Sequence, residues 1–206
     1  MRIKSVAAHP KRGGQHRITM EDGRAITVSE GALTAFYLYP GKEIEETELE
    51  ALMEADGRQK VRDRAMRLLD YRAMSRKELF NKLVEKGEDR EQAEEAADWL
   101  VEIGQIDDAE HAGRILRHYA GKGYGRKRIE QELRRRGIEK EHWDIAFMEM
   151  PEESGSAVDQ FIQSKLRGEM PDRKEEKRVT DALLRRGYSW DEAGAALRRY
   201  KESLEE

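Results

Sequence analysis

The sequence has no cysteine and no long apolar segment, and each absence excludes a class of protein. Without cysteine there is no disulfide, no thiolate nucleophile and no cysteine-based zinc or iron site, so a reducing compartment suits the chain. No segment approaches the ~20 apolar residues needed to span a bilayer. Residues 1–6 have no apolar core of signal-peptide length. We therefore expect a cytoplasmic protein that does not contact a membrane.

The balance of apolar and charged residues favours thin helical packing. Hydrophobic residues make up 37% of the 206 residues and charged residues 40%. So high a charged fraction does not suit one thick globular core, yet leucine, isoleucine and alanine recur too regularly for a disordered chain. Helices that bury a narrow apolar stripe and expose much surface satisfy both observations.

The formal net charge of −4 conceals blocks of opposite sign. Residues 114–137 contain nine lysine or arginine residues and only two acidic ones, Glu130 and Glu132. Residues 88–110 contain ten acidic residues and a single base. Blocks of this kind create local fields that bear on association with charged partners rather than on the fold.

The first forty residues differ from the rest, because apolar and polar residues alternate there with the period of a β-strand. Asp22-Gly23, a pair favoured in tight type I′ turns, separates two such segments, and we expect a β-hairpin around it. Residues 3–7 are a candidate third strand. A long helical segment begins near Thr47, and helical spacing continues from there to the end. The alternating apolar residues are Ile18 and Met20 before the turn, and Ile26 and Val28 after it.

Short motifs mark where helices start and stop. Four segments have the form of a capping box, in which the first side chain accepts from a free backbone N–H and a glutamate three residues later reaches back. These segments are Ser75–Glu78, Asp107–Glu110, Asp172–Glu175 and Ser189–Glu192. Glycine follows each apolar run, where a left-handed residue ends a helix without a Cβ clash. These glycines are Gly87, Gly104, Gly137, Gly168 and Gly187.

The helical part contains an internal repeat with an offset of 50 residues. A fixed period indicates tandem units, each burying an apolar face partly against its neighbour. The repeated apolar and glycine positions are Leu79, Ile129 and Val179; Leu83, Leu133 and Leu183; Gly87, Gly137 and Gly187; and Ala96, Ala146 and Ala196. A base precedes the repeated glycine each time, at Lys86, Arg136 and Arg186.

We therefore predict a mainly α fold, a tandem repeat of three three-helix modules that form an elongated array behind a small N-terminal β-hairpin cap. The predicted parts are the cap over residues 1–45, a long helix with the first module over 46–104, the second module over 105–153 and the third over 154–206. Each module has one tryptophan near an end of its third helix, which we expect in the core or at a module junction: Trp99, Trp143 and Trp190.

The most basic segment runs from Lys122 to Gly137 and joins a glycine-rich turn to a helix. Bases at the start of a helix and along its exposed face can grip a phosphate backbone or an acidic protein surface. The alternative is a solvated face whose arginines pair with Glu130 and Glu132. The number of bases exceeds what such pairing requires, which favours binding. Tyr124, between two glycines, is a candidate to stack on a base, although packing is the better explanation.

Three other interpretations are weaker. Short helices joined through glycine suggest a helix-turn-helix reader of DNA sequence, but the helix over 75–86 has few side chains suited to base edges. Asp107, Asp108, His111 and His118 can be drawn as a metal site, yet helix capping explains the acids. The sequence has no phosphate-binding loop, nucleophile elbow or paired-carboxylate motif. We predict that the protein is not an enzyme and holds neither a metal nor another cofactor.

Two stretches of the chain resemble the RecX family. The first is Ala65-x-x-Leu68-Leu69-x-Tyr71-Arg72-x-x-Ser75-x-x-Glu78-Leu79-x-x-Lys82-Leu83-x-x-Lys86-Gly87, continued by Leu100-x-x-x-Gly104-x-Ile106-Asp107-Asp108-x-x-x-Ala112. The second is Lys122-Gly123-x-Gly125-x-x-x-Ile129-x-x-Glu132-Leu133-x-x-x-Gly137-Ile138. The resemblance extends over residues 59–206, is most specific between 65 and 138 and weakens in the third module. The family often has an aromatic residue where this chain has His111.

The resemblance implies a curved, all-helical, non-catalytic regulator that lies in the groove of the RecA filament on single-stranded DNA. Such a protein modulates, and usually inhibits, strand exchange, ATP hydrolysis and co-protease activity in recombination, DNA repair and the SOS response. The expected partners are therefore the RecA filament and single-stranded DNA, contacted directly or through the filament by a monomer of this chain.

Charge and position select the residues of the expected contact face, since the family has no catalytic motif to carry over. The principal candidates are Lys122, Arg126, Lys127, Arg128, Arg134, Arg135 and Arg136. Weaker extensions are Arg72, Arg76, Lys77, Arg185 and Arg186. The leading alternative is a helical protein that binds nucleic acid non-specifically without a recombinase. A further alternative is a scaffold whose acidic blocks recruit a basic partner.

Overall fold

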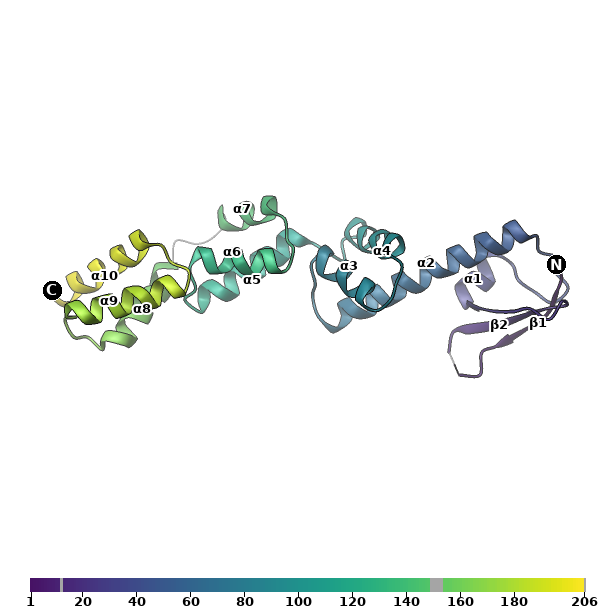
Figure 1. The fold of residues 1–206 in the computed structure, drawn as a ribbon, viewed down its shortest axis with the longest axis horizontal. Helices are drawn as coiled ribbons and strands as arrows, with labels where there is room; N and C mark the ends of the chain where they lie inside the picture. The colour runs from purple at the N-terminus through teal and green to yellow at the C-terminus, as the bar shows by residue number, and fades with distance from the viewer. Residues whose placement is uncertain (12, 149–153, 206) are drawn as a thin grey trace. The chain divides into compact units, whose positions relative to one another are not determined.

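The computed structural model describes residues 1–11, 13–148 and 154–205, and the chain forms two compact units. One unit comprises Met1–Arg72 and Phe80–Trp99, and the other Ala73–Leu79 and Leu100–Glu206. The described residues form one three-stranded sheet and ten helices (Figure 1). This confirms the predicted fold class, a mainly α chain with a small N-terminal β element. None of the described helices combines the length and apolar character needed to cross a membrane.

The N-terminal sheet is antiparallel, and its strands lie in chain order. The predicted hairpin is β2–β3, in which Ile18 pairs with Ile26, and the candidate third strand is β1, in which Val6 pairs with Ile18. Ile18 and Met20 are both buried because alternate residues of a strand point to the same face. The strand bounds are β1 Ile3–Ala8, β2 Gln15–Met20 and β3 Ala25–Ser29.

The turn between β2 and β3 is not the type I′ turn that Asp22-Gly23 suggests. A type I′ turn needs a positive φ at both central residues, whereas of this pair only Gly23 has one, +89°. The Gly23 N–H donates to the Met20 carbonyl oxygen at 3.1 Å, so the left-handed glycine follows a turn in a longer loop. The Asp22 carboxylate accepts from the Arg24 N–H at 2.9 Å, a local bond that competes with the two-residue turn.

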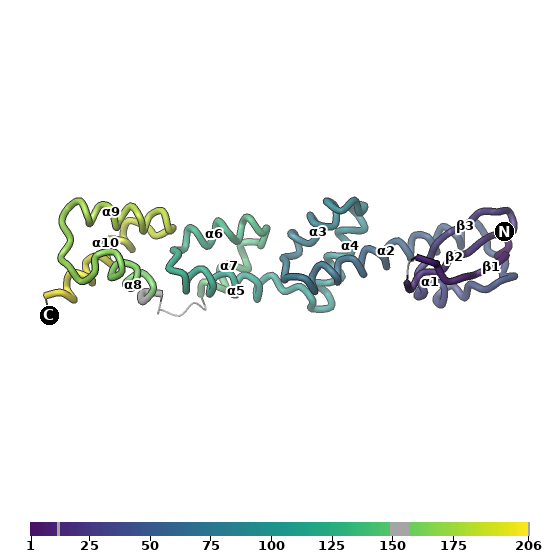
Figure 2. The backbone as a smooth tube through the Cα atoms, turned by 90° about the horizontal axis from the view of Figure 1, so that it is seen from below, coloured from purple at the N-terminus to yellow at the C-terminus, as the bar shows by residue number. Residues whose placement is uncertain are grey.

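Two helices complete the packing of the sheet. The short helix α1 (Glu30–Ala35) is not predicted from the sequence, and the Ser29 hydroxyl caps it by accepting from the Ala32 N–H at 3.2 Å. The long helix expected near Thr47 is α2 (Glu46–Tyr71). Its buried Asp56 carboxylate accepts from the Ser29 N–H at 2.8 Å and pairs with Lys60. This carboxylate therefore ties the end of β3 to α2, which runs beside the sheet (Figure 2).

The predicted start and stop signals mark ends of most of the eight further helices. The capping boxes at Ser75, Asp172 and Ser189 have both bonds in place. At Asp107 the carboxylate accepts from the Glu110 N–H at 2.8 Å, while the Glu110 carboxylate lies 3.9 Å from the Arg114 Nε. The five predicted stop glycines have φ between 67° and 93°. The bounds are α3 Arg76–Glu85, α4 Arg90–Glu102, α5 Asp108–Gly121, α6 Arg126–Arg135, α7 Lys140–Met148, α8 Ser154–Leu166, α9 Arg173–Arg185 and α10 Trp190–Glu205.

The second and third predicted modules each have a hydrophobic cluster, while the module boundaries themselves stay a prediction. The α5–α7 cluster contains Ile129 and Leu133, and the α8–α10 cluster contains their repeat equivalents Val179 and Leu183. The 50-residue repeat is thus a repeat of core positions in these modules. Trp143 is buried and donates from Nε1 to the Ile138 carbonyl oxygen at 2.8 Å.

The expectation of a core or junction position is wrong for Trp190. Its side chain is 68% exposed, because it is the first residue of α10 and lies outside the buried stripe that begins at Ala193. Trp99 is half-buried in the unit that contains the sheet, and the Arg62 guanidinium lies over its ring at 4.8 Å from the centroid. Exposure at Trp190 shows that an aromatic residue near a helix end does not identify a core position.

Candidate interaction surface

Four of the seven principal candidates on α6 and its leading turn are paired with glutamates of the same helix. Arg126 and Arg134 lie on either side of Glu130, at 2.9 Å and 3.3 Å from its carboxylate oxygens. Their guanidinium groups also lie over rings of α7, with Arg126 at 4.3 Å from the Phe147 centroid and Arg134 at 5.1 Å from that of Trp143. These two arginines therefore help to pack α6 on α7.

The second glutamate of α6, Glu132, is buried beneath two further arginines. Arg135 donates to both carboxylate oxygens, at 2.7 Å and 2.9 Å, and Arg136 donates from Nε at 2.8 Å. The bonds from Arg135, and then those from Arg136, outweigh the cost of burial and lower the pKa of Glu132 to about 2. The pairing that the alternative interpretation predicted is thus present at these arginines.

The other three principal candidates are Lys122, Lys127 and Arg128, all exposed at the start of α6. Within the described residues none of the three has a carboxylate partner. The Arg128 Nη1 donates to the Gln131 side-chain oxygen at 3.4 Å, which leaves its charge uncompensated. The bases of the segment that have no carboxylate partner in the described residues therefore lie at the N-terminal end of α6 and in the turn before it.

The start of α6 contacts the end of α9, so residues about sixty positions apart form one surface. The Gly125 N–H donates to the Arg186 carbonyl oxygen at 2.9 Å, and the Lys127 N–H donates to that of Gly187 at 3.1 Å. In return, the Arg186 Nη1 donates to the carbonyl oxygens of Lys122 at 2.9 Å and Gly123 at 3.2 Å. The exposed Arg185 precedes these contacts directly, and the structure thereby brings candidates from two modules together.

The start of α3 contacts the end of α6 in the same way, one repeat earlier. The Ser75 hydroxyl donates to the Arg136 carbonyl oxygen, as Gly125 donates to Arg186. Glycine is required at the receiving end, since a Cβ at Gly137 or at Gly187 would lie closer than 3.0 Å to atoms of the neighbouring module. At both junctions, the start of the second helix of one module thus contacts the glycine after the second helix of the next module: α3 with Gly137 after α6, and α6 with Gly187 after α9.

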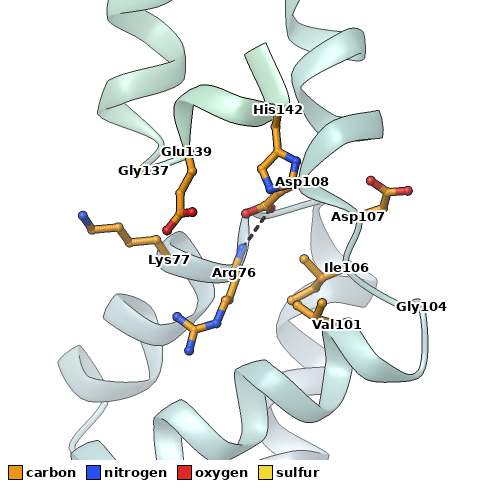
Figure 3. Close-up of a pocket in the computed structure, with 10 residues that line it drawn as sticks. All are labelled: Arg76, Lys77, Val101, Gly104, Ile106, Asp107, Asp108, Gly137, Glu139 and His142. Atoms are coloured by element: carbon orange, nitrogen blue, oxygen red, sulfur yellow. Dashed lines mark hydrogen bonds between the residues drawn. The ribbon is translucent and has the colours of Figure 1, made fainter. Parts of the chain in front are cut away.

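A cavity of about 490 Å³ lies beside the junction of α3 and α6 (Figure 3). Its lining carries both signs of charge, with the bases Arg76 and Lys77 and the acids Asp108 and Glu139, and the Arg76 guanidinium points away from Asp108. The Arg76 N–H donates to Asp108 Oδ1 at 3.1 Å. Burial nevertheless raises the pKa of Asp108 above its usual range. The cavity places the weaker candidates Arg76 and Lys77 next to acidic groups.

Three of the four candidate metal ligands, Asp107, Asp108 and His111, have structural contacts. Asp107 caps α5, Asp108 accepts from the Arg76 backbone, and buried His111 lies 3.9 Å from the Glu78 carboxylate. His118 is exposed, with its ring edge-on to Tyr119. Across the described ranges, no group of three histidine or acidic side chains is placed to hold a metal ion.

The last two candidates are Tyr124 and Arg72. Tyr124 is half-buried and packs between the Tyr119 ring, at 5.5 Å between centroids, and the Arg186 guanidinium, at 5.3 Å. Packing therefore explains it better than stacking on a base. Arg72 directly follows α2 and belongs to the unit that contains the sheet.

The described residues thus form a mainly α chain whose core positions repeat from one group of helices to the next. Family models match residues 62–100 and 107–146, and they describe the first and second three-helix domains of RecX. The chain belongs to the RecX family.

Individual relatives agree with this assignment. The Regulatory protein RecX of Vibrio campbellii is 30% identical over 137 residues, which cover 66% of this chain and 88% of that protein. The Regulatory protein RecX of Pseudomonas fluorescens is 34% identical over 132 residues, covering 64% and 85%. That of Lactobacillus delbrueckii subsp. bulgaricus is 26% identical over 194 residues, covering 92% and 71%. The relatives are thus named as regulatory proteins.

Solved structures show the same fold. A crystal structure of regulatory protein RecX matches with a TM-score of 0.75 and 27% identity, and the match covers 93% of this chain and 96% of that one. The crystal structure of RecX from Lactobacillus salivarius has a TM-score of 0.65 at 20% identity, covering 71% and 98%. The second of these supports the fold alone.

Proposed function

We propose that this protein binds the RecA filament on single-stranded DNA and inhibits its recombinase, ATPase and co-protease activities in recombination, DNA repair and the SOS response. Membership of the RecX family supports the partner. The observation that carries the proposal is the basic surface at the α6–α9 junction, where Lys122, Lys127, Arg128 and Arg185 have no carboxylate partner in the described residues. By this proposal the protein acts in the cytoplasm as a monomer and catalyses no reaction.

The paired and unpaired bases have different parts in this proposal. Arg126 and Arg134 to Arg136 pair with Glu130 and Glu132, so two of their four positive charges are neutralised and their side chains are held on the helix. The unpaired bases project charge that attracts phosphate groups and acidic protein segments. Their position on a junction made by backbone hydrogen bonds fixes their spacing, and fixed spacing lowers the entropic cost of binding. The contact face therefore centres on the start of α6.

The test is the single-stranded-DNA-dependent ATPase of RecA at near-physiological salt, titrated with this protein. The variant of choice is Lys122→Glu/Lys127→Glu/Arg128→Glu, because reversal of Arg134, Arg135 and Arg136 would also break the ion pairs of α6. The matched control is Lys174→Glu/Lys177→Glu/Arg178→Glu, which reverses three exposed bases of α9. We expect the wild type and the control to inhibit hydrolysis at similar concentrations. The α6 variant should need a concentration at least tenfold higher than the wild type for half-maximal inhibition.

A second measurement separates the proposal from non-specific nucleic-acid binding. Binding through phosphate contacts alone weakens steeply with salt, by on the order of 10³-fold between low and moderate salt for several contacts. A change in ATP hydrolysis at protein concentrations too low to coat bare DNA supports filament binding. If hydrolysis is unchanged while bare DNA is bound in a salt-sensitive way, the proposal gives way to the nucleic-acid-binding alternative.

A further inference from the structure

A second group of bases lines a cavity in the unit that contains the sheet. Arg64 and Arg67 on α2 and Lys86, directly after α3, surround a space of about 480 Å³ together with Leu68. None of the three bases was among the candidates for the contact face. Three of the four lining side chains are cationic, which is the composition of a site for an anion.

The charges of this cavity are only partly compensated. Arg64 forms an ion pair with Glu88, whose side chain is 18% exposed. Arg67 and Lys86 are both exposed, and neither has a carboxylate partner among residues 1–11, 13–148 and 154–205. Two cationic groups therefore remain available at the mouth of the cavity, with a third held in place beside them.

The internal repeat shows why this position is open. Lys86 is the repeat equivalent of Arg136 and Arg186, and the main chain at both of those residues accepts a hydrogen bond from the preceding module. The following glycine is in close contact at Gly137 and Gly187, whereas a Cβ at Gly87 would meet no described atom within 4 Å. In the first module, the residues around Lys86 and Gly87 thus lack the contact with a preceding module that their equivalents make in the later modules.

We propose that Arg64, Arg67 and Lys86 bind a phosphate group of single-stranded nucleic acid. The inference rests on the proposed function and extends it, because it adds a phosphate contact in the unit that contains the sheet to the bases of the α6 surface. A phosphate fits better than an acidic protein segment for two reasons. Arginine forks match phosphate oxygens in geometry, and Leu68 is the one apolar residue of the lining, whereas a bound peptide needs apolar pockets for its anchor side chains.

The test is the binding of a fluorescently labelled oligothymidylate to the full chain without RecA, measured by anisotropy at several salt concentrations. The variants are Arg67→Glu/Lys86→Glu and the milder Arg67→Gln/Lys86→Gln. Lys11→Glu/Arg17→Glu is the charge-matched control, since both of its residues are exposed in the part of the chain that forms the sheet. Circular dichroism confirms the fold of each variant.

We expect the Glu variant to bind the oligonucleotide about tenfold more weakly and to reduce the slope of log affinity against log salt by roughly 1, as loss of one or two phosphate contacts does. The Gln variant is expected to fall between it and the wild type, and the control to match the wild type. Equal affinity of wild type and pocket variants overturns the proposal. So does an equal loss in the control, which indicates a long-range effect of net charge.

Three further outcomes decide what occupies this site and separate it from the proposed function. If a glutamate-rich peptide binds the wild type and the oligonucleotide does not, the cavity serves an acidic protein segment and the phosphate proposal is wrong. If the pocket variants bind the oligonucleotide like the wild type but still inhibit the RecA ATPase, the proposed function stands and only the phosphate site is lost. If RecA is unaffected by the wild type while oligonucleotide binding depends on Arg67 and Lys86, the phosphate site stands and the proposed function is wrong.

Discussion

Arg186, the residue directly after α9, donates a hydrogen bond from Nη1 to the backbone carbonyl oxygen of Lys122, 2.9 Å away, in the turn before α6. The same guanidinium lies 4.2 Å from the centre of the Phe161 ring in α8. One side chain of the third module thus contacts both its own helices and the neighbouring module. A residue that the sequence suggests as a surface contact is in this structure a link between modules.

Replacement of Arg186 by alanine is expected to loosen this junction. The change removes two bonds to carbonyl oxygens and the ring contact, so we expect a loss of ~1–3 kcal/mol in the free energy of unfolding measured with urea. Hydrogen exchange of the Gly125 and Lys127 amides should become faster, because both donate across the junction. Arg185→Ala is the control and should cost less than ~0.5 kcal/mol. Equal losses in both variants would contradict the linking role.

The stop glycines should tolerate alanine unequally. Gly87→Ala and Gly187→Ala both place a Cβ at a positive φ, +88° and +93° respectively, and that costs ~1–2 kcal/mol. At Gly187 the new Cβ would also meet Arg128 of the preceding module, whereas at Gly87 it meets no described atom within 4 Å. We expect Gly187→Ala to lose an additional ~1–3 kcal/mol in thermal unfolding. Similar melting temperatures for the two variants would rule out a tight junction.

Stability should depend on pH through Glu132. Its folded pKa of about 2 lies below its ordinary value of 4.5, because Arg135 and Arg136 stabilise the charged carboxylate. Its contribution is therefore fully present above the unfolded pKa and is lost as the pH falls through the folded pKa. We expect Glu132→Gln to destabilise the protein at pH 6 by ~1–3 kcal/mol and much less at pH 2, in urea titrations. A constant difference across that range would show that the pairing does not stabilise the fold.

The buried Asp56 should be needed for the packing of the sheet on α2. Asp56→Ala leaves the Ser29 N–H without its acceptor and removes the ion-pair partner of Lys60, which keeps only its bond to the Thr27 carbonyl oxygen, and we expect a loss of ~2–3 kcal/mol. Asp63→Ala on the same helix is the control, since Asp63 is exposed and accepts from the Gln59 side chain. Faster hydrogen exchange at Ser29 in the first variant alone would support the link. An Asp56→Ala protein as stable as the control would refute it.

The sequence predicted the helical part well because its signals are local. Capping boxes and stop glycines depend on residues within one turn of each other, and three of the four boxes form as expected, at Ser75, Asp172 and Ser189. The hairpin was found through alternation, while its turn type was not, because the Asp22 carboxylate bonds to the Arg24 N–H instead. The helix α1 was missed because six residues carry too little periodicity to identify a helix.

The sequence predicts which segment contains the candidate site, but not which of its side chains form an exposed basic surface. The basic stretch is visible in the sequence, but pairing depends on side-chain geometry that sequence spacing leaves open. By spacing alone, Lys127 could pair with Glu130 and Arg128 with Glu132. In the structure Glu130 pairs with Arg126 and Arg134 instead, and Glu132 pairs with Arg135 and Arg136. The cavity at Arg64, Arg67 and Lys86 gave no signal at all, because its residues come from two helices and are individually ordinary surface bases.

By itself the sequence determined the fold class, the positions of the repeat and the family, because helical periodicity, capping and a fixed 50-residue offset are properties of the chain read in order. Only the tertiary structure decided which bases are free to bind. Glu130, Glu132 and the carbonyl oxygens at the junctions occupy some of the arginines and leave others exposed. The physical reason is that a charged side chain is available to a binding partner only where the folded chain itself supplies no opposite charge or hydrogen-bond acceptor for it.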